Sequence, residues 1–136
     1  MRKLIVSVLA VAVLAAGGVG AALAMQSSAT TKVTEKEWGV TPLPAKVKAG
    51  KVTFSVKNIG HLNHEFIVIR TSKLANRLPT RGAVAVVTTG QVGKIAQFKP
   101  GVTRTLTLTL KAGHYVLICN LPGHYKAGQY TNFTVG

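Results

Sequence analysis

Three residues in the last third of the chain have the types and spacing for metal chemistry. Cys119, His124 and Gln129 follow one another at intervals of five, and Pro122-Gly123 lies between the first two. A Pro-Gly pair is a turn signal. Such a turn can bring a thiolate and an imidazole onto one metal ion, and sulfur together with imidazole selects copper or zinc rather than magnesium or calcium.

One more imidazole would complete such a site, and the chain offers two upstream candidates. His61 and His64 lie just before the apolar residues 65–71, and their spacing alone does not choose between them. Alternatives remain open for the other residues as well. A lone buried Cys119 can be simply a small hydrophobic residue, and Gln129 can face solvent without binding a metal.

Composition excludes several other chemistries. The 136 residues include 17 Lys or Arg and only three acidic residues, all of them Glu, for a formal net charge of +14. Without Asp, an Asp-based catalytic triad and a carboxylate cage for Mg²⁺ or Ca²⁺ are excluded. The single cysteine excludes an intrachain disulfide. We expect no enzyme, because a hydrolase needs a base and a group that orients it.

The N-terminus indicates export. Arg2 and Lys3 precede an uncharged run over residues 4–24 that ends in Ala22-Leu23-Ala24, a pattern typical of a signal peptide cleaved after residue 24. The alternative is an uncleaved membrane anchor, since the run approaches the ~20 residues that span a bilayer. Both place the protein in the periplasm, at the cell surface or outside the cell. Residues 25–31 are small and polar, which predicts a flexible lead before a domain over 32–136.

The rest of the chain has the pattern of an all-β protein. Residues 51–57 and 102–110 alternate apolar with polar side chains, whereas 65–71 are continuously apolar, as expected for a strand buried on both faces. Strands are also expected over 113–119 and 129–135. Seven or eight short strands separated by turn signals predict a β-sandwich or small barrel. A short helix ended by Pro79 is expected within 72–81.

This pattern resembles the cupredoxins, the type 1 (blue) copper proteins. The resemblance rests on Cys-x4-His-x4-Gln after an apolar strand, with a remote His after Asn-x-Gly. The ligand spacings are similar to those of plant stellacyanin, and the flanking sequence resembles small bacterial exported cupredoxins. The similarity covers residues 46–136 and is strongest over 113–136. It implies a Greek-key β-sandwich of seven to eight strands that binds one copper ion and carries one electron.

The resemblance also implies a ligand set. Cys119 would be the thiolate ligand, His64 and His124 the imidazole ligands, and Gln129 a weak axial ligand where most of the family has Met. Trigonal His₂Cys sites with a long axial Met or Gln are electron-transfer centres.

The same resemblance selects His64 over His61, because Asn58 and Gly60 match the family's frame before the ligand. The family usually has a polar residue after this histidine, whose N–H and side chain tie the ligand loops together. Here that residue is Glu65, whose carboxylate can accept hydrogen bonds but not donate them.

The excess of positive charge suggests partners. A strongly basic protein is steered toward an acidic docking face on a redox partner, or held at an anionic cell surface. Beyond residue 24 the basic residues are scattered, with no run of three, so we expect no nucleic-acid-binding arm. Two alternative functions remain: a copper carrier or buffer without redox turnover, and a basic OB-like nucleic-acid-binding domain.

Overall fold

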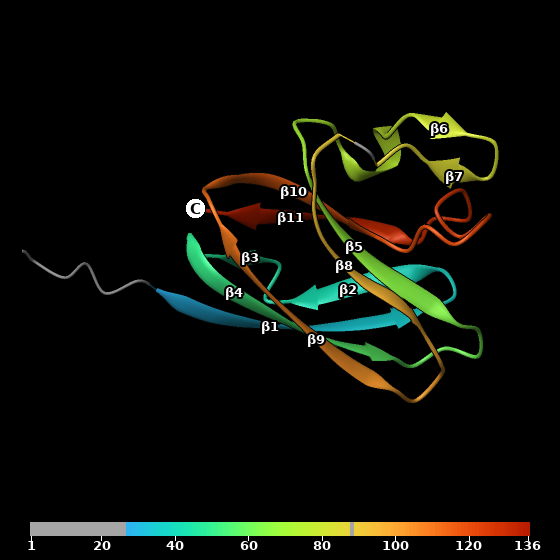
Figure 1. Ribbon diagram of the computed structural model, residues 1–136, viewed down its shortest axis with the longest axis horizontal. Coiled ribbons are helices and arrows are strands. Elements are labelled where there is room, and N and C mark those ends of the chain that lie inside the picture. Colours follow the sequence, from blue (N-terminus) through green and yellow to red (C-terminus); the bar gives the residue numbers. More distant parts are fainter. Residues whose placement is uncertain (1–26, 88) are drawn as a thin grey trace, which may run out of the picture.

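Two β-sheets pack face to face in the computed structural model of the protein, which describes residues 27–87 and 89–136 (Figure 1). The predicted signal peptide or anchor, residues 1–24, lies outside this range. The strands in the described residues are β1 (Ser28–Lys36), β2 (Gly39–Leu43), β3 (Lys46–Val47), β4 (Gly50–Asn58), β5 (His64–Arg70), β6 (Thr80–Arg81), β7 (Val84–Ala85), β8 (Gln91–Phe98), β9 (Thr103–Leu110), β10 (Gly113–Ile118) and β11 (Tyr130–Val135). None of the helices described is long and apolar enough to cross a membrane.

The chain crosses repeatedly between the sheets. One sheet has the order β2-β1-β4-β9 and the other β3-β11-β10-β5-β8, while β6 and β7 form a separate ribbon. Pairing is antiparallel except between β1 and β4 and between β3 and β11. The predicted all-β sandwich is confirmed. The described chain has more strands than the seven or eight expected because β3, β6 and β7 contain two residues each.

The core follows from the side-chain patterns. Val52, Phe54 and Val56 alternate along β4 and are fully buried, and the Phe54 ring lies 5.4 Å from Phe66 and 5.3 Å from Phe133 between the sheets. The β-sandwich therefore buries one face of each alternating strand, as the period-two pattern predicts.

Strand β5 is different, because both of its faces are covered. Phe66 and Val68 belong to the core between the sheets. Ile67 and Ile69 belong to a second cluster that includes residues of the 3₁₀ helix η1 (Ala75–Arg77) and of β7. This confirms the expectation of a doubly buried strand, and η1 lies within the segment where a short helix was expected.

The predicted flexible lead over residues 25–31 is wrong for residues 28–31. Strand β1 begins at Ser28, which pairs with Lys51 of β4, and Thr31 is fully buried with its hydroxyl 3.3 Å from the Pro44 carbonyl. Small polar residues suggested a linker, but threonine is also a good strand former. The domain therefore starts at or before Ser28.

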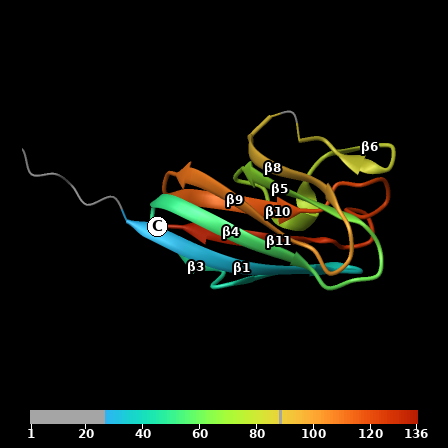
Figure 2. The same cartoon turned by 60° about the horizontal axis from the view of Figure 1, so that its bottom comes forward.

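The two ends of the sandwich differ. The C-terminus and the start of β1 lie at the same end of the sandwich in both views (Figures 1 and 2). The other end gathers four connections: the β1–β2 turn, the β4–β5 loop, the β8–β9 turn and the β10–β11 loop. The N–H of Ile59, in the β4–β5 loop, donates to the carbonyl of Glu35 in β1 at 2.8 Å. The metal-ligand candidates lie at this end.

Candidate metal centre

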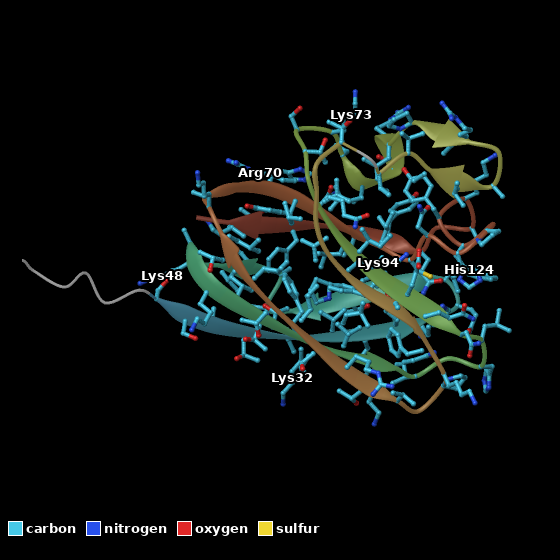
Figure 3. The ribbon with its side chains drawn as sticks, in the orientation of Figure 1. Lys32, Lys48, Arg70, Lys73, Lys94 and His124 are labelled. Carbon is cyan, nitrogen blue, oxygen red and sulfur yellow. The ribbon has the colours of Figure 1, made fainter. Side chains whose placement is uncertain are left out.

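Neighbouring strands place the four predicted ligands together. His64 is the first residue of β5, Cys119 directly follows β10, and Gln129 directly precedes β11, while His124 lies in the loop between β10 and β11. Because β10 pairs with both β5 and β11, the ends of these strands meet at one place. Figure 3 shows His124 at the end of the sandwich away from Lys48.

Three of the donor atoms surround a single point. The Cys119 Sγ atom lies 3.3 Å from Nδ1 of His124 and 3.8 Å from Nδ1 of His64, and the two Nδ1 atoms are 3.3 Å apart. Bonds of about 2.0 Å to nitrogen and about 2.3 Å to sulfur would separate ligands in a trigonal plane by about 3.5 to 3.7 Å. The donor set therefore fits one metal ion of the size of copper or zinc.

The Gln129 amide faces the same point. Its Nε2 atom is 2.9 Å from Nδ1 of His64, and its Oε1 atom is 3.1 Å from Nδ1 of His124. The side chain is fully buried, so the alternative in which Gln129 faces solvent is wrong. Its role as an axial ligand stays a prediction, which the position of the amide oxygen makes physically reasonable.

The β10–β11 loop is held by its own backbone. The Cys119 N–H donates to the Gln129 carbonyl at 3.1 Å, and the Gln129 N–H donates to the His124 carbonyl at 3.1 Å. Gly123 provides the turn with φ = 86°, a left-handed conformation that favours glycine. These bonds fix the spacing of the three loop donors without any metal.

The upstream loop is held by an asparagine. The Asn58 side chain donates to the Leu62 carbonyl at 2.8 Å and accepts from the Gly60 N–H at 2.9 Å. This bracing turns His64 inward, where its side chain is completely buried, and leaves His61 exposed. Of the two upstream histidines, the described structure places His64 in the cluster.

Glu65 plays only part of the role that the resemblance implies. Its N–H lies 3.4 Å from Cys119 Sγ and can donate to it, which links the β5 and β10 ends of the site. Its carboxylate pairs with Lys94 of β8 at 2.6 Å. The side chain therefore ties β5 to β8 rather than one ligand loop to the other.

Burial determines the protonation of the donors. Burial raises the pKa of Cys119 to about 12, although the N–H groups of Glu65 and Leu121 lower it, so the free thiol keeps its proton at neutral pH. Burial lowers the pKa of His64, an effect that the nearby Glu37 carboxylate partly offsets. His64 is therefore a neutral imidazole. A soft metal ion would have to displace the thiol proton.

Two residues near the site were not predicted as functional. Glu37 and Trp38 lie in the β1–β2 turn, 27 and 26 residues before His64. The Glu37 Oε1 atom is 3.0 Å from Nε2 of His64. The Trp38 ring is 46% exposed and meets the His124 ring edge-on, with centroids 5.0 Å apart. Nothing in their spacing pointed to the site, because only the fold brings this turn to the ligand loops.

Glu35 is a further unusual group near this end. It lies on the inner face of β1 and is completely buried, and neither carboxyl oxygen has a hydrogen-bond partner within the described residues. Burial, together with the charge of Glu65, raises the pKa of Glu35 to about 9. Glu35 is therefore a neutral carboxylic acid at pH 7.

Comparison with solved structures identifies the fold. Auracyanin A, a "blue" copper protein of Chloroflexus aurantiacus, superposes with a TM-score of 0.61 at 21% identity, covering 81% of this chain and 100% of auracyanin A. Rusticyanin of Thiobacillus ferrooxidans gives 0.61 at 15% identity, covering 79% and 77%. Auracyanin of Roseiflexus castenholzii gives 0.60 at 17% identity, covering 82% and 98%. No protein-family model and no curated protein matches the sequence.

The chain is thus a cupredoxin-like β-sandwich, as the resemblance implied. At these identities the similarity establishes the fold alone. The metal has to be inferred from the donor atoms of this chain.

Proposed function

We propose that the protein is an exported mononuclear type 1 copper protein that carries one electron at a time. Copper would be held by Nδ1 of His64, Sγ of Cys119 and Nδ1 of His124, with Gln129 as the weak axial ligand. The observation that supports this most is the convergence of three donor atoms within 4.8 Å of one another, made by a thiol and two imidazoles on a cupredoxin-like fold. This donor set matches a blue-copper centre.

The protein's contribution to electron transfer is rigidity. Copper, when bound, supplies the one-electron change between Cu(I) and Cu(II). The loop hydrogen bonds around Cys119 and Gln129 keep the donors in place in the metal-free chain, so little has to move when the charge of the metal changes. Burial of His64 and Cys119 excludes water from one side. His124 is partly exposed and touches Trp38, which makes this edge the proposed path for the electron.

Addition of Cu(II) to the purified metal-free protein tests the proposal. We expect an intense blue or green colour at one copper per chain, because a copper–thiolate bond absorbs strongly. Cys119→Ser is the matched control: serine is nearly isosteric but a poor ligand for a soft metal, so this variant should stay folded and lack the colour. A colourless protein that binds one Zn²⁺ tightly and no Cu(II) would contradict the copper assignment.

The alternative functions are less well supported. Copper carriage without redox turnover would use the same ligands; fast electron self-exchange favours the electron carrier, and slow exchange with ready copper release favours the copper carrier.

The OB-like alternative requires a five-stranded barrel, whereas this chain forms two sheets. We propose no catalytic activity, because the thiol and the two clustered imidazoles, the groups best suited to nucleophilic catalysis, are assigned to the metal.

Electrostatics supports an acidic docking face on the redox partner. Of the three glutamates, Glu35 is buried, Glu37 contacts the site, and Glu65 pairs with Lys94. Basic side chains such as Lys32, Lys48, Arg70 and Lys73 point outward on several sides (Figure 3). A surface of this kind attracts anionic partners at low salt. Rates with an acidic partner should fall as ionic strength rises.

Association with an anionic cell surface is supported by the outer face of one sheet. The outward side chains of β1, β4 and β9 are all Ser, Thr or Lys: Ser28, Thr30, Lys32, Thr34, Lys36, Lys51, Thr53, Ser55, Lys57, Thr103, Thr105, Thr107 and Thr109. This face carries lysines and no acidic group. Export itself rests on the sequence of residues 1–24, and N-terminal sequencing of the secreted protein would identify the cleavage site or show an anchor.

A further inference from the structure

Glu37 is not a proposed metal ligand, yet its carboxylate contacts the metal centre. Its carboxylate accepts hydrogen bonds from the N–H groups of His61 at 3.1 Å and Leu62 at 2.7 Å, both in the β4–β5 loop. Its Oε1 atom also lies 3.0 Å from Nε2 of His64. One side chain of the β1–β2 turn therefore contacts both a metal-ligand candidate and the loop that leads to it.

The space around this carboxylate is closely fitted. A Cβ atom at Gly60 would lie 2.5 Å from Oε1 of Glu37, a distance that real contacts do not allow. Gly60 has no left-handed backbone conformation, so the constraint at this position is space rather than backbone freedom. A larger residue at position 60 would require the Glu37 carboxylate to move from its present place.

The Nε2 atom of His64 is available to donate a hydrogen bond to the Glu37 carboxylate. Its Nδ1 atom points at the other donors, and its buried Nε2 atom has no aligned hydrogen bond within the described residues. The Glu37 oxygen is the acceptor within reach. A neutral imidazole carries one N–H, and a carboxylate beside Nε2 keeps that proton on Nε2, which leaves the lone pair of Nδ1 for a metal.

Gln129 supports the same tautomer from the opposite side of the ring. Its amide Nε2 is 2.9 Å from Nδ1 of His64 and can donate to it. The carboxylate adds what the amide cannot, a full negative charge. The backbone N–H groups of Leu62 and His61 both donate to this carboxylate, and such donors favour the charged form of a carboxylate.

We propose that Glu37 is a positioning residue of the metal centre, which orients His64 through Nε2 and places a negative charge beside the bound metal. The second half of this proposal rests on the proposed copper function. An anion next to the ligand stabilises Cu(II), the more highly charged state, relative to Cu(I). Glu37 would therefore lower the reduction potential.

Two substitutions of Glu37 distinguish the effect of its negative charge from its effect on the orientation of His64. Glu37→Gln keeps the shape and one acceptor oxygen but removes the charge; Glu37→Ala removes both. Glu35→Gln is the matched control, because Glu35 lies two residues earlier and is already a neutral acid. Each variant is compared with the wild-type chain by copper titration, redox potentiometry, thermal melting and, in the metal-free state, nitrogen NMR of the His64 ring.

The expected results differ between the variants. Glu37→Gln should favour Cu(I) about tenfold more than the wild type, a rise in potential of about 59 mV, because Cu(II) affinity falls about tenfold more than Cu(I) affinity. Glu37→Ala should lose Cu(II) affinity by about 10- to 100-fold, the usual cost of removing a partner of a metal-bound histidine. It should also speed exchange of the His64 Nε2 proton in the metal-free protein. Glu35→Gln should leave the potential, the Cu(II) affinity and the exchange of the His64 Nε2 proton unchanged.

Other outcomes would overturn the proposal. If Glu37→Ala lowers only the melting temperature, while potential, copper affinity and His64 proton exchange stay unchanged, Glu37 merely braces the loop. If Glu35→Gln shifts the potential as much as Glu37→Gln does, the shift is not caused by the Glu37 charge. Failure of the wild type to bind copper would refute the proposed function and the charge effect, while the metal-free NMR would still decide whether Glu37 positions His64.

Discussion

The two histidines of the metal centre lie in contrasting surroundings. His64 is fully buried at the start of a central strand, with its far nitrogen beside the Glu37 carboxylate. His124 lies in a loop, is partly exposed, and meets the edge of the exposed Trp38 ring. We therefore expect the two histidines to have different roles. The buried His64 side fixes the geometry and charge of the site, and the exposed His124 side connects it to a partner.

The largest effect is expected from removing each imidazole in turn. His64→Gly and His124→Gly should each weaken copper binding by more than about a hundredfold, since a direct ligand matters more than the 10- to 100-fold typical of an outer partner. Added imidazole should restore the colour of His124→Gly, because its cavity opens to solvent, and should not restore that of His64→Gly. Absorption spectra during imidazole titration measure both.

His61→Ala is the control for the upstream histidine. His61 is exposed and lies outside the donor cluster, so copper binding should be unchanged. Equal rescue of both glycine variants would contradict the contrast between a buried and an open imidazole. Loss of copper in His61→Ala but not in His64→Gly would show that the upstream ligand is assigned to the wrong residue.

A second effect concerns the buried Glu35 and the pH dependence of the protein's folding stability. Because burial raises the pKa of Glu35 to about 9, the folded state keeps a proton that the unfolded state releases above its ordinary pKa of 4.5. Stability contributed by the neutral acid is therefore lost as pH rises from about 5 to 9, by up to about 1.4 kcal/mol per pH unit.

Glu35→Gln should remove this pH dependence. Denaturant unfolding of the metal-free wild type and variant at pH 5, 7 and 9 measures it, and the variant should gain stability relative to the wild type as pH rises. Parallel stability curves would show that Glu35 does not keep its proton in the folded state.

The smallest expected effect comes from changing Gln129, whose amide lies between the two histidines. The Gln129 amide lies 2.9 Å from one Nδ1 and 3.1 Å from the other, and an amide oxygen is a harder donor than a thioether. Gln129→Met should therefore favour Cu(I) and raise the potential by about 59 mV or more, a tenfold change in the one-electron equilibrium. Potentiometry and the absorption spectrum measure the change.

Gln129→Ala provides the comparison for this substitution. If the methionine and alanine variants both keep the wild-type potential and spectrum, Gln129 does not bind copper. The ligand set would then be His64, Cys119 and His124 alone.

Local sequence was enough to predict the main strands and the half of the metal site that lies in the β10–β11 loop. Alternation in residues 51–57 and in 102–110, where Arg104 breaks it, identified strands with one buried face, because strand side chains point alternately to opposite sides. The Cys119, His124 and Gln129 spacing identified the loop site, since its donors are joined by a short chain that a Pro-Gly turn reverses. Residues 28–31 were misjudged because their role depends on pairing with β4, which local composition does not encode.

The other half of the site depends on tertiary structure. Asn58 and Gly60 suggested His64 by resemblance, but only the pairing of β5 with β10 brings it to Cys119. Glu37 and Trp38 carried no recognisable signal, because the β1–β2 turn reaches the ligands through space alone. The sequence by itself thus determined which residues can bind a metal. The packing of the two sheets decided which carboxylate and which aromatic ring surround them, since long-range contacts exist only once the sandwich has formed.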